Sequence, residues 1–254
     1  MDLSGKRGVV FGVANEHSIA WPIASILHEA GARLAITYQN DRFRDRVARL
    51  TESMPGTLLL ECDVSRDESI AAAFDEMARE LGGLDFMVHS IAFANRDDLR
   101  GEFSKTSRDS FLLSLDISAY SLIPLVRHSA DLMPNGGSIV AMTFQASERV
   151  FPGYNIMGTA KAALENEVRQ LSQEYGGANV RVNAISAGPL ETLASRGIHG
   201  FPDMRRIHAE RAPLRRNITH HEVAKTALFL CSDLASGITG TVIPVDAGYH
   251  IMGI

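Results

Sequence analysis

The sequence has little of what stabilises small secreted proteins, spans a membrane or attracts nucleic acid. Only two cysteines, Cys62 and Cys231, occur among 254 residues, too few for a disulfide framework, so we expect two reduced, buried thiols. The net charge of −5 argues against the concentrated basic surface that nucleic acid requires. No apolar stretch approaches membrane-spanning length, and residues 1–7 lack a signal-peptide apolar region. These absences predict a cytoplasmic protein with neither nucleic acid nor membrane as a partner.

The chain does have a regular alternation of short apolar runs and longer helical patterns. Seven runs read as strands, at residues 8–13, 32–38, 57–62, 85–89, 138–142, 180–185 and 241–245. Helical patterns lie between them, at residues 18–30, 41–53, 66–81, 107–133, 154–175 and 220–232. This alternation predicts an α/β fold with a parallel sheet covered on both faces, which right-handed crossovers make doubly wound. We expect a single Rossmann-type domain over residues 1–254, built on seven parallel strands.

Two strand ends suggest a nucleotide site, because ligands of doubly wound sheets bind beyond the carboxyl ends of the strands. After the first strand, Gly12 lets the backbone approach a pyrophosphate, and Ser18 can cap the helix whose N-terminus faces that anion. After the second strand, Gln39 can hydrogen-bond a ribose hydroxyl but cannot neutralise a 2′-phosphate. This favours NADH over NADPH, although Arg42 and Arg44 lie close by in the sequence.

The third and fourth strand ends extend this set. Asp63 can lie near the adenine amino group with Val64 against the ring; alternatively, Asp63 caps the following helix. Ser90, Ile91 and Ala92 are small or apolar residues that can line the cofactor channel. Each feature alone also fits a purely structural role, but their succession on alternating strands favours a dinucleotide site.

Together these motifs resemble those of the bacterial enoyl-[acyl-carrier-protein] reductases, a branch of the short-chain dehydrogenase/reductase superfamily. The likeness is carried by Gly12-x5-Ser18-Ile19-Ala20, Tyr38-Gln39-Asn40-Asp41, Cys62-Asp63-Val64, His89-Ser90-Ile91-Ala92, Tyr154-x6-Lys161 and Arg181–Pro189, and it continues through Phe229–Asp233 and Val245–Gly248. The resemblance implies an oxidoreductase of fatty-acid biosynthesis and lipid metabolism. It also implies a homotetramer with contact faces on the helices near 107–133 and 154–175.

The spacing around Lys161 separates this branch from ordinary alcohol and ketone reductases. Most superfamily members carry Tyr-x3-Lys with a serine thirteen residues before the tyrosine, and those two positions hold Met157 and Phe144 here. Neither side chain can donate a proton. Tyr154 instead stands seven residues before Lys161, and two helical turns would place both side chains on one face. The enoyl reductases show this same Tyr-x6-Lys arrangement.

By this resemblance the chain reduces the carbon–carbon double bond of 2-enoyl-acyl-carrier-protein thioesters with a hydride from NADH. The Tyr154 hydroxyl would stabilise the charge that develops on the thioester oxygen, and Lys161 would hold the nicotinamide ribose. The family's second tyrosine is Phe144 here. One alternative is therefore a reductase of another α,β-unsaturated thioester or carbonyl substrate, and another is a non-catalytic dinucleotide-binding module.

Residues 187–216 break the strand–helix alternation with small, basic and Pro residues and suggest a mobile lid more than a packed element. The resemblance places Leu190 and Thr192 near the cofactor carboxamide. It assigns the substrate pocket to Ala94, Phe144, Tyr154, Phe201 and Met204. The arginines of this segment fit either a solvated basic face or docking of an acidic acyl carrier protein: Arg205, Arg206, Arg211, Arg215 and Arg216. The histidines show no metal-ligand spacing, and no metal is expected.

Overall fold

The computed structural model describes residues 1–192 and 195–253. At its centre lies a seven-stranded sheet in the order β3-β2-β1-β4-β5-β6-β7, with every neighbouring pair parallel. Its strands are β1 (Arg7–Phe11), β2 (Arg33–Tyr38), β3 (Leu58–Glu61), β4 (Phe86–His89), β5 (Gly137–Thr143), β6 (Val180–Ala187) and β7 (Val242–Val245). The predicted doubly wound α/β fold is confirmed, with strand bounds within two residues of those expected.

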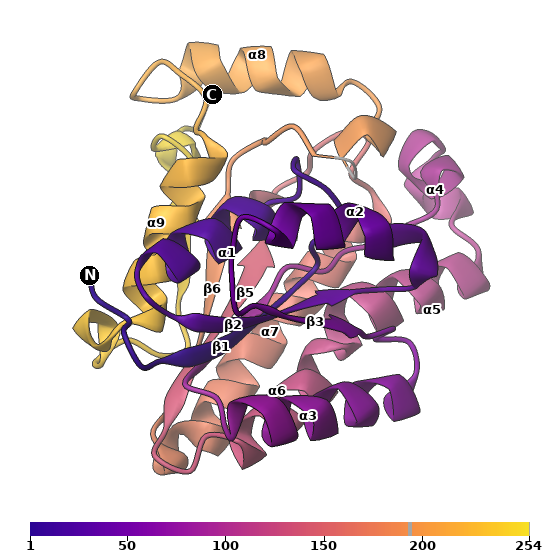
Figure 1. Ribbon diagram of the computed structural model, residues 1–254. Helices are drawn as coiled ribbons and strands as arrows, with labels where there is room; N and C mark the ends of the chain where they lie inside the picture. Colours follow the sequence, from indigo (N-terminus) through magenta and orange to yellow (C-terminus); the bar gives the residue numbers. More distant parts are fainter. Residues whose placement is uncertain (193–194, 254) are drawn as a thin grey trace.

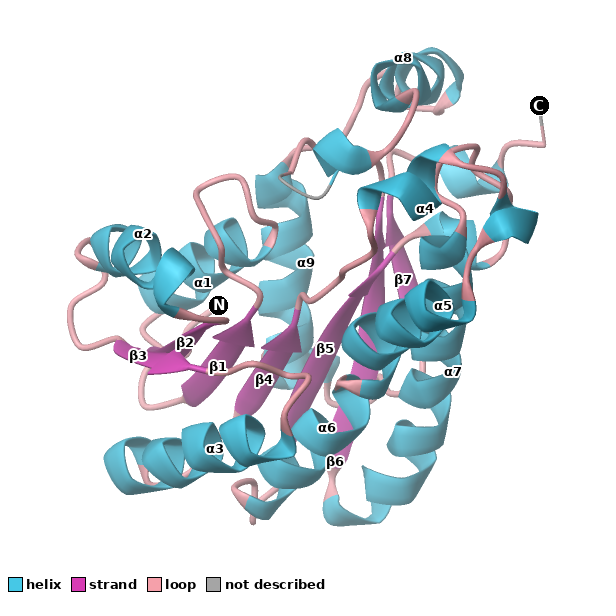
Figure 2. Ribbon diagram, turned by 90° about the vertical axis from the view of Figure 1, so that its right-hand side faces the viewer, coloured by secondary structure: helices cyan, strands magenta, loops and turns pink. Residues whose placement is uncertain are grey.

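Helices cover both faces of the sheet (Figures 1 and 2). The described helices are α1 (Ala20–Glu29), α2 (Asp41–Thr51), α3 (Asp67–Leu81), α4 (Arg96–Arg100), α5 (Arg108–Leu115), α6 (Leu122–Asp131), α7 (Ile156–Tyr175), α8 (Phe201–Arg211) and α9 (His220–Cys231). Successive strand residues enter opposite cores: Val10 packs with α1 and α9, whereas Val9 packs with α3, α6 and α7. Both faces are thus apolar, which explains why the strands read as continuous apolar runs.

The strand order reverses between β1 and β4. From β1 the chain builds outward to β2 and β3, then returns to add β4 beside β1 and continues the other way to β7. The loops that follow β1 and β4 therefore diverge and leave a crevice beyond the carboxyl ends of these strands, where doubly wound folds bind ligands.

The helix expected over residues 107–133 is not continuous. Between α5 and α6 a π-helical turn spans Asp116–Tyr120. The Ser118 hydroxyl accepts a hydrogen bond from the Phe93 N–H (2.9 Å) and donates one to the Phe93 carbonyl (3.0 Å). These two hydrogen bonds link the turn to the segment after β4, and single π turns inside helices are frequent at functional sites. Residue spacing carries no signal for this turn.

The same helical stretch corrects the expectation that no segment approaches membrane-spanning length. Arg108–Asp131 spans 24 residues with a mean hydropathy of 1.3 in its most apolar window, long and apolar enough by length and composition to cross a membrane. Nearly half of that window, 44%, is buried inside the structure, and α6 packs against α3 and α7. The apolar residues of α6 are therefore part of the core beside the sheet, whereas Leu112 and Tyr120 remain exposed.

A helix, α8, lies within residues 187–216, where no helix was expected, and only its Phe201 and His208 are buried. Gly200 precedes the helix with a positive φ of 73°, Pro202 occupies its first turn, and Asp203 is acidic there. Arg211 in the last turn complements the helix dipole. These start and stop signals were present in the sequence, but the weak apolar periodicity concealed them. Residues 193–194 of the same segment lie outside the described residues.

Candidate functional site

A cavity of about 710 Å³ opens at the carboxyl ends of the strands. Its wall is formed by the strand ends, the first turn of α7, and the segment that leads from β6 into α8. Every residue assigned to the site from the sequence lies on this wall: Gly12, Ser18, Ile19, Gln39, Asp63, Val64, Ser90, Ile91, Ala92, Ala94, Phe144, Tyr154, Lys161, Leu190, Thr192, Phe201 and Met204. Residues from eight separate segments of the chain thus converge on one space.

A glycine is required at position 12 because the backbone after β1 lies against the backbone after β4 there. Its φ is 98°, and a Cβ built on it would lie 2.0 Å from the Ser90 carbonyl oxygen. Any side chain at this position would therefore collide with the backbone of the neighbouring strand end. The absence of a side chain also leaves the loop backbone open to the cavity.

Ser18 does not cap α1, contrary to the expectation. The N-cap of α1 is Ile19, and no side chain bonds to that helix terminus. The Ser18 hydroxyl instead accepts hydrogen bonds from the N–H groups of Ala14 (3.1 Å) and Asn15 (3.2 Å). It therefore fixes the loop that follows β1, while the first turn of α1 borders the cavity uncapped. A helix of ten residues with an open N-terminus attracts an anion.

The ends of β2 and β3 border the same cavity. Gln39 is exposed at its rim, beside the Asn40 side chain that caps α2 by accepting from the Arg42 N–H at 3.2 Å. Asp63 accepts hydrogen bonds from the Ser65 N–H (3.1 Å) and hydroxyl (2.8 Å). The N-cap of α3 is Arg66, so the alternative that Asp63 caps this helix is wrong. Both polar side chains thus remain at the cavity.

Lys161 lies on the buried face of α7 and is only 4% exposed. Its Nζ donates to the carbonyl oxygens of Met142 (2.9 Å) and Ile91 (3.4 Å), which end or follow neighbouring strands. Burial lowers the pKa of this amine to about 8, against the opposing effects of Glu165 and Glu167. An ammonium has three donors, so one N–H remains for a ligand in the cavity.

Tyr154 and Phe144 form the apolar side of the site. Their ring centroids are 4.9 Å apart with a tilted geometry, and the Phe144 ring also lies 4.7 Å from that of Phe151. Burial raises the pKa of the Tyr154 phenol, so this group stays protonated and can donate a hydrogen bond throughout the neutral range. The rings hold each other at a geometry that aromatic pairs prefer.

Tyr154 is placed by a strained neighbour that sequence reasoning missed. The helix expected from residue 154 begins at Ile156, so Tyr154 and Lys161 do not share one helical face; the turn before α7 brings Tyr154 to the cavity. Asn155 there has a φ of 39° and a ψ of −120°, which a residue with a side chain rarely adopts. Its amide donates to the carbonyls of Asp98 and Gly101, each at 2.9 Å. Such strain is typical of functional sites.

Described residues between β6 and α8 form part of the cavity wall. Leu190 is 6% exposed and Phe201 is 9% exposed. The Thr192 N–H donates to the Ser195 hydroxyl at 2.8 Å, and the Ser195 N–H donates to Thr192 Oγ1 at 3.0 Å. Apolar burial therefore holds Leu190 and Phe201 at the cavity, and hydrogen bonds link Thr192 to Ser195.

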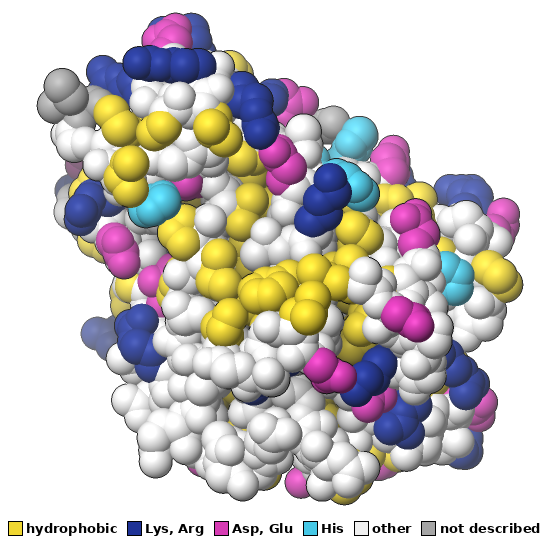
Figure 3. Space-filling view, turned by 90° about the vertical axis from the view of Figure 1, so that its left-hand side faces the viewer, with side chains coloured by type: hydrophobic (Ala, Val, Ile, Leu, Met, Phe, Trp, Pro, Cys, Tyr) yellow, Lys and Arg dark blue, Asp and Glu magenta, His cyan; other side chains and the backbone are white. Residues whose placement is uncertain are grey.

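The arginines of this region are largely paired within the chain. Arg205 forms an ion pair with Glu191 beside the cavity. Arg206 Nη1 lies 3.0 Å from Glu210 Oε1. Arg216 Nη2 lies 2.7 Å from Glu222 Oε1. Figure 3 shows acidic side chains beside the basic ones at the top of the molecule, where α8 lies. The basic face expected from the sequence is thus partly neutralised.

Other cavity residues escaped the sequence analysis. Thr37 on β2, Phe93 after β4 and Ile117 in the π turn line it as well. Only Phe93, an apolar residue that follows the Ser90–Ala92 group, gave a signal that could have been used. Within residues 1–192 and 195–253, no group of three His, Cys, Asp or Glu side chains could hold a metal ion.

The chain resembles proteins of one family over its whole length. The family model described as enoyl-(acyl carrier protein) reductase matches residues 12–250. The enoyl-[acyl-carrier-protein] reductase [NADH] of Nostoc sp. is 51% identical over 257 residues and covers 100% of both chains. The enoyl-[acyl-carrier-protein] reductase [NADPH] of Staphylococcus aureus is 46% identical over 252 residues, 98% of each chain.

A solved structure agrees with these matches. It is the Bacillus cereus enoyl-acyl carrier protein reductase with NADP+ and indole naphthyridinone, which superposes with a TM-score of 0.98 at 50% identity over 100% of both chains. The likeness spans the full sequence and the full fold, and the chain belongs to the enoyl-(acyl carrier protein) reductase family.

Proposed function

We propose that the chain uses NADH to reduce the carbon–carbon double bond of 2-enoyl-acyl-carrier-protein thioesters. One observation carries this proposal. Tyr154 and Lys161 lie on the wall of one cavity with the Gly12 loop, while Met157 and Phe144 occupy the positions that give other superfamily branches their proton donors. Relatives named for this activity are about half identical over the full chain.

The cavity fits a dinucleotide on the observations of this structure. The space beside Gly12 admits a bulky anion next to the uncapped first turn of α1. Gln39 and Asp63 provide polar groups for the adenosine half, and the third Nζ donor of Lys161 can bind ribose hydroxyls. Gln39 carries no charge to match a 2′-phosphate, which supports NADH. The Nostoc and Bacillus cereus relatives are named for NADH, and a Staphylococcus aureus relative for NADPH.

When bound, NADH supplies the hydride, and the residues of the chain stabilise the charge that this transfer creates. The Tyr154 hydroxyl, held protonated by its raised pKa, can donate to the thioester oxygen on which negative charge accumulates. Lys161 adds a positive charge to the same cavity wall. Phe201, Met204 and Ala94 provide apolar surface for the acyl chain. Phe144 takes no part in proton donation, because its ring has no hydroxyl.

The test follows the absorbance of the reduced nicotinamide with purified protein, crotonyl thioesters of acyl carrier protein and coenzyme A, and NADH or NADPH. Oxidation of NADH in preference to NADPH is the expected result. Tyr154→Phe should lower kcat by about 10–1,000-fold and leave the Kd for NADH within about twofold. NADH binding without turnover of either thioester would contradict the proposal and favour another unsaturated substrate or a non-catalytic module.

The substrate lid and the carrier contact are part of this proposal. The chain forms one catalytic domain, and residues 187–216, including α8, close over the acyl chain. Arg205 and Arg206 are engaged by Glu191 and Glu210, so an acidic carrier protein would have to compete with these pairs. Reversing both arginine charges should raise KM for the carrier-bound thioester and spare the coenzyme A thioester; equal effects on both would remove the docking role.

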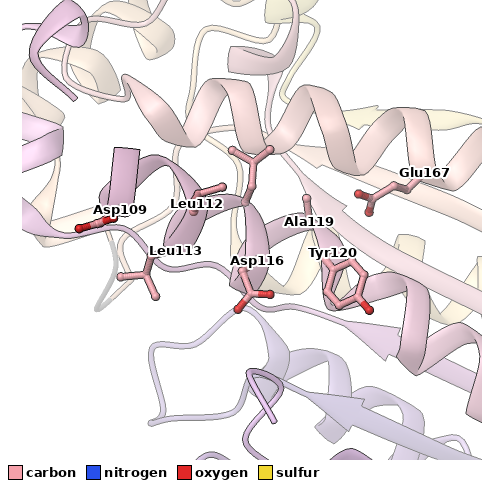
Figure 4. A pocket seen from close by; sticks show the side chains of 8 residues that line it. Asp109, Leu112, Leu113, Asp116, Ala119, Tyr120 and Glu167 are labelled. Carbon is pink, nitrogen blue, oxygen red and sulfur yellow. The ribbon is translucent and has the colours of Figure 1, made fainter. Parts of the chain in front are cut away.

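We also propose a cytoplasmic homotetramer. One candidate contact is a hollow of about 570 Å³ on the α5–α7 face, lined by Leu112, Tyr120 and Glu167 among others (Figure 4). Leu112 is 58% exposed and Tyr120 is 45% exposed, and an apolar face of this kind favours association. A hydrophobic band also crosses the face shown in Figure 3. Leu112→Glu should reduce the mass measured by light scattering; an unchanged tetramer would exclude this face, and a monomeric wild type would refute the assembly.

A further inference from the structure

Two consecutive residues at the end of β5 form hydrogen bonds with two residues of α7 that lie one helical turn apart. The Met142 carbonyl accepts a hydrogen bond from Lys161 Nζ at 2.9 Å. The next residue, Thr143, donates its hydroxyl to the Glu165 carboxylate at 2.6 Å. Residues four apart lie on the same side of a helix, so one helix face presents an amine and a carboxylate to one strand end.

This contact is buried and borders the active cavity. Glu165 is 4% exposed and Thr143 is 5% exposed, and Thr143 lines the cavity. A buried carboxylate is costly unless it is hydrogen-bonded and compensated by a positive charge. The hydrogen bond comes from Thr143, and Lys161 is the cation on the same helix face.

We propose that Glu165 is a positioning residue for the reaction: its buried carboxylate holds Thr143 at the cavity wall and keeps Lys161 in its ammonium form. Its effect on turnover rests on the function proposed above, whereas its effect on Lys161 does not.

The other charged groups around Lys161 cannot replace Glu165. Glu167 lines the hollow beside α5 and not the active cavity, and Thr143 bonds to Glu165. Burial raises the pKa of Glu167 to about 7, so at about pH 8 it is mostly ionised in the wild type and in Glu165→Gln alike, and its charge does not account for a difference between them. His89 faces Lys161 from β4, and its Nε2 lies 2.9 Å from the Ser121 hydroxyl. Burial, followed by the charge of Lys161, lowers the pKa of His89 to about 3, so it is neutral. Tyr154, on the cavity side, is protonated and neutral.

The expected size of the effect follows from the Lys161 pKa of about 8. A nearby opposite charge shifts a pKa by about 1–3 units, so its removal should bring the midpoint to about pH 7 or below. The protonated fraction at about pH 8 then falls by about fivefold, and that at about pH 6.5 by less than about 1.5-fold. Glu165→Gln should therefore lower kcat/KM for NADH by about fivefold at the higher pH and hardly at the lower one.

The direct readout is the Lys161 pKa itself, measured by NMR in cofactor-free protein that carries ¹³C-labelled lysine. The chain has only four lysines, and Lys161→Arg identifies the relevant resonance. Glu165→Gln keeps the shape of the side chain and an acceptor for Thr143, and it should lower this pKa by about one unit. Glu174→Gln makes the same chemical change at an exposed position of α7 and serves as the matched control.

Two further variants separate charge from contact. Glu165→Asp keeps the charge and should hold the pH midpoint near that of the wild type. Thr143→Val replaces the hydroxyl by a methyl group and leaves the charge of Glu165 in place. The factor by which it lowers kcat/KM should therefore be the same at about pH 6.5 as at about pH 8. An unmoved Lys161 pKa in Glu165→Gln, or an equal shift in Glu174→Gln, would overturn the proposal. A lowered Lys161 pKa without any change in kcat/KM would confirm the coupling and remove Lys161 from the proposed cofactor contact.

Discussion

Gly12→Ala tests whether the approach of β1 to β4 creates the cofactor site. The added Cβ would lie 2.0 Å from the Ser90 carbonyl oxygen at a φ of 98°. Two costs therefore combine: about 1–2 kcal/mol for an L-residue with a positive φ, and about 1–3 kcal/mol for overpacking against backbone that cannot rotate away. The substitution should destabilise the protein by about 2–5 kcal/mol in total.

Gly56→Ala is the matched control for the first cost alone. Gly56 has a φ of 82°, but a Cβ there meets nothing within 4 Å. At about 3 °C per kcal/mol, the middle of the range for a chain of this size, Gly56→Ala should lower Tm by about 3–6 °C and Gly12→Ala by about 6–15 °C. Both are measured by thermal unfolding at one fixed protein concentration, because association would shift Tm.

The functional consequence separates the two variants further. To relieve the overlap, the Gly12 loop must move away from Ser90 by more than about 1 Å, and a misplacement of this size costs about 100-fold in rate. We expect kcat/KM for NADH to fall by about that factor in Gly12→Ala and to stay unchanged in Gly56→Ala. A Gly12→Ala protein with the stability of Gly56→Ala and kcat/KM within about threefold of the wild type would refute the reasoning.

Three other predictions concern Lys161, Asn155 and Phe144, at or beside the cavity. The Lys161 pKa of about 8 lies 2.5 units below its ordinary 10.5, so folding disfavours the ammonium: stability is reduced below about pH 8 and recovers as pH rises towards 10.5. Lys161→Met would remove this penalty of about 3 kcal/mol, but it leaves the buried Glu165 without its compensating cation and the Met142 carbonyl without its donor, which costs about 3–5 kcal/mol. We therefore expect a somewhat lower Tm of the cofactor-free protein at neutral pH and a loss of turnover, and a raised Tm would contradict this. Asn155→Ala should lower kcat by about 10–100-fold with little change in the Kd for NADH, because it misplaces Tyr154; equal losses in both would indicate general disruption. Phe144→Tyr should alter kcat by less than about threefold, because Tyr154 already supplies the hydroxyl, and a larger gain would show that a second hydroxyl limits the wild-type rate.

The sequence by itself determined the sheet and the members of the site. Continuous apolar runs separated by helical patterns specify a parallel sheet covered on both faces, because such strands must be apolar on both sides. Once the strand order follows from right-handed crossovers, the residues after each strand must meet at one edge. Gly12, Gln39, Asp63 and Ser90 could therefore be assigned to one cavity before their positions were known, and all line it.

The tertiary structure decided how those residues are held. The Ser18 hydroxyl accepts hydrogen bonds from the N–H groups of Ala14 and Asn15 in the loop and does not cap the helix. Buried N–H groups require an acceptor, and which groups lie near Ser18 depends on the fold of the loop. The π turn formed where the Ser118 hydroxyl could bond the Phe93 backbone, a contact between residues far apart in sequence.

Helix α8 and the Thr143–Glu165 contact show the same limit. Weak periodicity concealed α8, whose Phe201 is buried at the cavity. Glu165 reads in the sequence as one more acidic residue on a helix, and only the packing of α7 against β5 turns it into a buried partner of Thr143. Local pattern specifies which face of an element is buried, whereas the partner that a polar side chain meets there depends on where the other elements pack.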